Sequence, residues 1–159
     1  MWGTKPSETD VTILDVENNT LSLQRDVFEE TYLIQDSIRK FDWKITGETR
    51  EIAGFECKKA VTKICDSVYI VAFYTDQIIA NAGPESFNGL PGLILGLAVP
   101  RLATTWFATK VEMTTPTPKE LAPSQKGKKV NWKKLYVDMN KAMKDWGKEG
   151  ARNIWKFSL

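Results

Sequence analysis

Apolar and polar residues alternate through most of the first 114 residues, which is typical of half-buried β-strands. The alternation is clear in residues 21–28, where Leu21, Leu23 and Val27 share one side of the predicted strand. Turn residues separate consecutive segments, so neighbouring strands should pair as hairpins in an antiparallel meander over about residues 11–114. The predicted strands are residues 11–17, 21–28, 31–36, 43–52, 55–64, 68–75, 93–100 and 104–113. Both faces of residues 68–75 are apolar, which predicts a central strand covered on both sides.

The pattern changes after the last predicted strand. Residues 115–130 are rich in Pro and Lys and are typical of a loop. Asn131 then suits a helix N-cap, and apolar residues recur at helical spacing over about residues 131–147. This stripe consists of Trp132, Leu135, Tyr136, Met139, Met143 and Trp146. It could cover the apolar face of the sheet, or it could dock on a partner or a membrane surface.

These elements predict a mainly β fold of the α+β class. We expect a curved antiparallel meander, or alternatively a half-barrel, with one C-terminal amphipathic helix. The length of 159 residues suits a single domain over residues 1–159.

The chain contains no histidine and only two cysteines, Cys57 and Cys65. The lack of histidine excludes Ser-His-Asp and Cys-His catalysis and His-ligated zinc sites. Two thiols exclude a four-thiolate metal site within one chain. We therefore predict no catalytic residue, no metal ligand and no cofactor, and the composition disfavours an enzyme.

Charge is unevenly distributed along the chain. Residues 119–159 carry an excess of Lys and Arg, whereas residues 1–118 carry an excess of Asp and Glu. A basic tail can bind nucleic acid, but no aromatic motif for nucleic acid accompanies it, so nucleic acid is not an expected partner. The longest apolar window, residues 90–100, is too short to cross a bilayer, and the N-terminal residues lack the pattern of a signal peptide.

Residues 83–97 combine glycines, prolines and an apolar run. They match neither a phosphate-binding loop nor a nucleophile elbow, because the required Gly-rich and Gly-x-Ser-x-Gly patterns are missing. We interpret them as turns that lead into a buried strand, with Gly92 free to adopt a positive φ. A ligand or partner contact is the alternative, through Gly83, Pro84, Phe87, Gly89, Leu90, Pro91 and Gly92.

The glycine-rich segment also belongs to a longer series of motifs. In order, these are Trp43, Ile52-Ala53-Gly54, Cys57-Lys58-Lys59-Ala60, Tyr74-Thr75, Gly83-Pro84 and Gly89-Leu90-Pro91-Gly92-Leu93-Ile94. Over residues 43–95 this series resembles the GLPGLI family, uncharacterised envelope proteins of Bacteroidetes-type bacteria. The resemblance implies a location in the periplasm or cell envelope, and a chain preceded by an export signal and further β sequence. It implies no catalytic residue. Cys65 departs from the family pattern.

The function expected from these observations is a non-enzymatic envelope module that binds an apolar ligand or an outer-membrane partner. The candidate partners are a lipid-like molecule and an outer-membrane protein. A structural module for protein–protein interaction is the first alternative. A Cys- or carboxylate-dependent enzyme is the second, and it would require a cleft around Cys57 or an acid pair.

Overall fold

The computed structural model describes residues 11–27, 30–64, 68–121, 126–142 and 144. Contacts group the chain into two compact units. The first unit is Met1–Ile38 with Thr115–Leu159, and the second unit is Arg39–Thr114. The prediction of one domain over residues 1–159 stays a prediction.

The first unit contains a four-stranded sheet in the order β1-β2-β3-β9. Its strands are β1 (Val11–Asp15), β2 (Thr20–Val27), β3 (Glu30–Ser37) and β9 (Lys128–Val130). The first three strands pair antiparallel, and β9 pairs parallel to β3. The unit also contains the short helix α1 (Pro118–Leu121) and the helix α2 (Trp132–Ala142).

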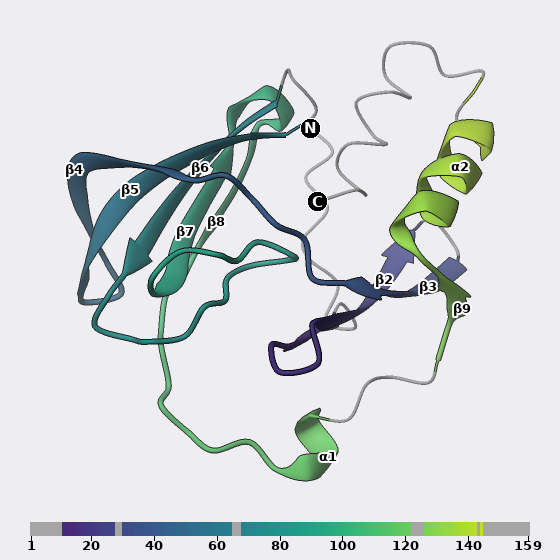
Figure 1. The fold of residues 1–159 in the computed structure, drawn as a ribbon, viewed down its shortest axis with the longest axis horizontal. Helices are drawn as coiled ribbons and strands as arrows, with labels where there is room; N and C mark the ends of the chain where they lie inside the picture. The colour runs from purple at the N-terminus through teal and green to yellow at the C-terminus, as the bar shows by residue number, and fades with distance from the viewer. Residues whose placement is uncertain (1–10, 28–29, 65–67, 122–125, 143, 145–159) are drawn as a thin grey trace. The chain divides into compact units, whose positions relative to one another are not determined.

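Helix α2 packs on this sheet (Figure 1). Leu135 and Met139 join a buried cluster with Leu23, Tyr32, Ile34 and Val130, and Trp132 packs against it. The predicted cap is confirmed, because Asn131 Oδ1 accepts a hydrogen bond from the Lys134 amide at 2.8 Å. Asp36 of β3 accepts a second bond, from the Trp132 amide at 3.0 Å, and so ties the start of the helix to the sheet.

The second unit contains a five-stranded antiparallel sheet in the order β4-β5-β6-β7-β8 (Figure 1). Its strands are β4 (Lys44–Ile52), β5 (Phe55–Ile64), β6 (Val68–Thr75), β7 (Leu93–Val99) and β8 (Thr104–Phe107), with a 3-10 turn, η1 (Pro100–Leu102), before β8. Ala53 and Gly54, both at positive φ, form the tight turn predicted between β4 and β5.

The predicted mainly β fold with a C-terminal amphipathic helix is confirmed. The structure differs in how the strands are grouped, because they form two sheets and not one meander. Strands β3 and β4 follow each other along the chain but belong to different sheets. Between them, Phe41 and Trp43 pack against Phe87. The predicted loop 115–130 contains α1 and β9, and the strand predicted over 104–113 ends at Phe107.

The packing of α2 can be tested with one buried and one exposed position. Leu135 is 1% exposed, whereas Val137 on the same helix is 56% exposed. We expect Leu135→Ala to lower the free energy of unfolding by about 2–5 kcal/mol, because it removes buried methyl groups and leaves a cavity. Val137→Ala should change it little. Urea unfolding followed by circular dichroism measures both, and equal effects would contradict the packing described here.

Candidate functional site

The glycine-rich segment between β6 and β7 is fastened to the second unit by buried side chains. Phe87 is completely buried, and its ring centroid lies 5.1 Å from that of Phe41 and 6.5 Å from that of Trp43. The Trp43 indole Nε1 donates a hydrogen bond to the Asn88 carbonyl at 2.7 Å. The Asn88 amide donates to the carbonyls of Arg39 and Ser86. The segment is therefore an ordered part of the fold.

Gly92 has a role different from the one predicted. Its φ is not positive, and the glycine of this segment that adopts a positive φ is Gly89, at +95°. A Cβ at position 92 would lie 2.0 Å from the carbonyl oxygen of Thr75. Glycine is needed at position 92 because the backbone passes directly against the end of β6.

The residues predicted to contact a ligand in this segment differ in accessibility. Phe87, Leu90 and Gly92 are buried, Gly83 and Pro84 are half-buried, and Gly89 and Pro91 are exposed. The buried members have structural roles, and a binding role for the exposed ones stays a prediction.

The predicted docking stripe on α2 is largely covered by its own unit. Leu135 and Met139 face the buried cluster, and Trp132 is partly buried against it. Tyr136 is 46% exposed. Met143 and Trp146 lie outside the described residues. A docking role for this stripe also stays a prediction.

The five-stranded sheet has one buried and one accessible face. The buried face includes Ala60, Ile70, Ala72, Leu97 and Val99, all of them at 0% exposure. Most of their neighbours point the opposite way and are half-buried or exposed, whereas Gly96, Ile52 and Cys57 on that side are buried. We call this second side the open face: Arg50, Lys59, Val61, Lys63, Tyr69, Val71, Phe73, Ala98, Thr105 and Phe107. Strand β6 is central as predicted, but its second side is covered only in part: Tyr69 is 56% exposed, whereas Phe73 packs against the buried cluster of Ile52, Cys57 and Leu95.

Arg50 lies on the edge strand β4, and its side chain reaches two aromatic rings of the open face. Strand pairing places Phe73 beside Gly96 and Gly96 beside Phe107. The Arg50 guanidinium carbon is 5.6 Å from the centre of the Phe73 ring and 4.9 Å from that of Phe107. These are cation–π distances. Glycine is needed at position 96 because a Cβ there would lie 2.8 Å from Ile52 Cδ1 and 3.0 Å from Phe107 Cε1.

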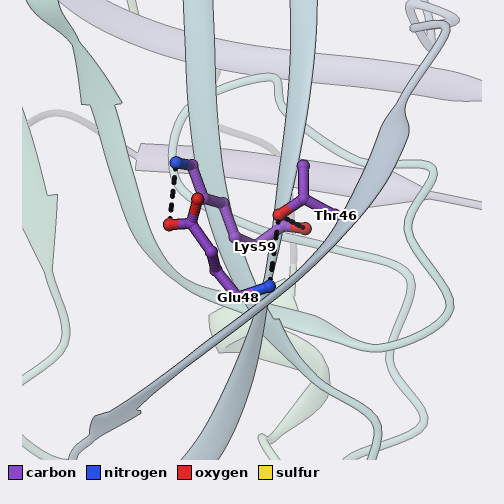
Figure 2. A network of polar contacts seen from close by, with 3 residues as sticks. All are labelled: Thr46, Glu48 and Lys59. Carbon is purple, nitrogen blue, oxygen red and sulfur yellow. Dashed lines mark hydrogen bonds and ion pairs between the residues drawn. The ribbon is translucent and has the colours of Figure 1, made fainter.

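A β-bulge in β4 supplies further polar groups to the open face. The pairing of β4 with β5 shifts between Ile45 and Thr49. Figure 2 shows the result: Glu48 Oε2 lies 3.0 Å from Lys59 Nζ, and Thr46 Oγ1 links the Glu48 amide to the Lys59 carbonyl. Bulges often re-aim side chains next to functional sites. Here the bulge aims a carboxylate at the lysine that pairs with Phe73.

A second cation–aromatic pair lies further along the open face. Lys63 and Tyr69 are partners across β5 and β6. Lys63 Nζ is 5.7 Å from the centre of the Tyr69 ring. The open face therefore combines exposed aromatic surface with charged hydrogen-bonding groups at two positions.

The thiol of Cys57, which lies on the same side of β5 as Lys59, is not activated. Cys57 is free and fully buried, in a cluster with Ile52 and Leu95. Burial raises the pKa of the Cys57 thiol, which suppresses the thiolate needed for nucleophilic attack. No group of three or more His, Cys, Asp or Glu side chains suited to a metal ion occurs within the described ranges.

On the other face of the hairpin formed by β4 and β5, Lys58 Nζ forms an ion pair with Asp76 Oδ2 at 2.7 Å. The hydrogen bond between them raises the pKa of Lys58 and lowers that of Asp76. Both side chains are about half exposed, so this pair contributes little to stability.

The described residues thus form a two-sheet, mainly β module with an accessible face of aromatic and charged side chains. Residues 4–138 match the family described as "N-glycanase peptide, N-terminal domain", and the chain belongs to this family.

Two solved structures of PNGF-II, in space groups C2 and P21, share the fold. Each is 24% identical to this chain, with TM-scores of 0.57 and 0.58. The matches cover 81% and 83% of this chain, but 24% and 25% of the PNGF-II chains, so the chain spans about a quarter of their length. No curated protein matches this chain.

The predicted membership of the GLPGLI family, and the unknown function attached to it, are therefore wrong. The resemblance rested on residues 43–95, whereas the family match extends over residues 4–138. Local packing requires several of the motif residues. Trp43 donates a hydrogen bond to the Asn88 carbonyl of the glycine-rich segment, and Gly92 lies against the backbone of Thr75. The predicted antiparallel sheet is confirmed.

Sequence reasoning missed the open face as a site. Arg50, Phe73 and Phe107 lie on three different strands, and only the strand pairing brings them together. The one available signal was the high proportion of polar residues in the predicted strand 43–52.

Substitution of two glycines tests the packing of the glycine-rich segment. We expect Gly92→Ala to destabilise the protein by about 3 kcal/mol or more, because the added Cβ would collide with the Thr75 carbonyl. Gly47→Ala is the matched control, since a Cβ there has no neighbour within 4 Å. Thermal unfolding measures both, and similar melting temperatures for the two variants would contradict the close approach at Gly92.

Alkylation tests whether Cys57 can act as a nucleophile. In a Cys65→Ser variant, we expect iodoacetamide to react with Cys57 at least ~100-fold more slowly in the folded protein than in urea, because the thiol is buried and its pKa is raised. Mass spectrometry over time measures both rates. Comparable rates would support a Cys-dependent enzyme.

Proposed function

We propose that this chain is a non-catalytic glycan-recognition module of a larger N-glycanase-type protein, and that sugars bind to the open face. Membership of the N-glycanase N-terminal-domain family supports the glycan as the target class. The coverage of about a quarter of the PNGF-II chains supports the idea of a module that works beside other parts. Glycan release itself is assigned to those other parts.

One observation carries the proposal: the Arg50 guanidinium lies over Phe73 and Phe107 on an accessible sheet face. Sugar rings present apolar C–H surfaces that can stack on aromatic rings, and their hydroxyls need donors and acceptors close by. The open face offers both, with Phe107 at 41% exposure and the Lys59–Glu48 pair alongside.

An apolar ligand has less support. The largest fully buried side chains, such as Leu23, Leu97 and Phe87, belong to the packed interior of their units.

Within the described ranges, no helix is both long and apolar enough to cross a membrane. A place of action outside the cytoplasm is part of the proposal, because N-glycans lie on the surface loops of secreted proteins.

Binding of a free N-glycan tests this function directly. We expect isothermal titration with a biantennary N-glycan to show binding, and Phe107→Ala to weaken it roughly fivefold through the loss of stacking. Tyr136→Ala is the matched control, because Tyr136 is similarly exposed but lies on α2. Absence of binding by the unmodified chain would overturn the proposal, and an equal loss in both variants would remove the open face as its site.

A further inference from the structure

We propose that the open face selects glycans that carry an acidic group, a carboxylate or a sulfate. This inference rests on the proposed function and names the class of glycan that the same site prefers. It follows from the charges on this face, from the absence of ion pairs at Arg50 and Lys63 among the described residues, and from the aromatic rings that lie beside these two cations.

The charges on this face are predominantly positive. Arg50, Lys59 and Lys63 belong to the open face, and Lys44 joins them because its partner in the register is Val61. The carboxylate brought in by the bulge, Glu48, is paired with Lys59 at 3.0 Å. The other cations thus face solvent without a carboxylate to neutralise them from the described strands of this sheet.

The opposite face of the same hairpin has a different character. Glu51 and Glu56 lie directly across from each other there, and Lys58 is paired with Asp76. The positive charge is therefore a property of one face and not of the hairpin as a whole. A negatively charged ligand would discriminate between the two faces.

Two cations of the open face are positioned without being neutralised. Within the described residues, neither Arg50 nor Lys63 forms an ion pair, and each lies over an aromatic ring. A ring restricts where the cation can lie but accepts no conventional hydrogen bond from it, so the N–H donors stay available. Arg50 could then bind a carboxylate or sulfate through two parallel hydrogen bonds.

The distance between the Arg50–Phe73 pair and the Lys63–Tyr69 pair suits an oligosaccharide. Phe73, under Arg50, and Tyr69, beside Lys63, are four residues apart on β6, which is about 13 Å along a strand. Half-buried Val61 and Val71 lie between them and continue the accessible surface. A chain of several sugars can contact both positions, whereas a single acidic sugar reaches only one.

A pair of glycans that differ only in charge tests this inference. Isothermal titration of the full chain would use a sialylated biantennary N-glycan and the same glycan after removal of its sialic acids. We expect the acidic glycan to bind at least roughly tenfold more tightly at low ionic strength, as charge-assisted hydrogen bonds predict. The preference should shrink as salt is added.

Three variants locate the preference. Arg50→Gln and Lys63→Gln should each reduce the ratio of the two affinities several-fold. Lys58→Gln is the matched control, because it removes the same charge from the same strand on the opposite face, and it should leave the ratio unchanged. Circular dichroism confirms folding, and Lys63, whose side chain is exposed, provides a test if Arg50→Gln disturbs the sheet.

The outcomes separate this inference from the proposed function. Equal affinity for both glycans would overturn acidic selectivity and leave glycan recognition standing. An equal loss of preference in Lys58→Gln and Lys63→Gln would also overturn it, because the effect would then follow net charge and not the open face. Binding of neither glycan would overturn both proposals.

Discussion

Successive side chains of a β-strand point to opposite sides, and this alternation governs the second unit. Because Ala60, Ala72 and Leu97 must point to the buried side, their neighbours Lys59, Phe73 and Gly96 must share the other side. A slip of the register by one residue would bury the cations and expose the core. The same hydrophobic burial that stabilises the sheet therefore assembles the open face.

Two local departures from regular structure shape that face. Gly96, between Phe73 and Phe107 in the register, leaves space for the side chains of Ile52 and Phe107, which a Cβ would approach to 2.8 and 3.0 Å. The bulge in β4 turns Glu48 toward Lys59 and so neutralises one of the cations. The glycine thus serves the buried cluster that contains Ile52, whereas the bulge determines which charged groups a ligand would meet.

The features that could be predicted from the sequence depend on neighbours along the chain. The Asn131 cap and the tight turn at Ala53 and Gly54 are local, and the structure has both. Strand β9 was missed because it has only three residues, two of them lysines, and it exists only by pairing with β3. The stacking of Arg50 depends likewise on contacts between distant strands, which periodicity does not contain.

Mapping of the bound glycan on the protein tests the central claim most directly. In ¹⁵N-labelled full chain titrated with a biantennary N-glycan, the account predicts amide shift changes concentrated in β4, β5, β6 and β8, with the indole signal of Trp43 unchanged because it is fastened to the Asn88 carbonyl. Changes confined to residues 83–92 or to α2 would contradict the account and place binding at the glycine-rich segment or the helix.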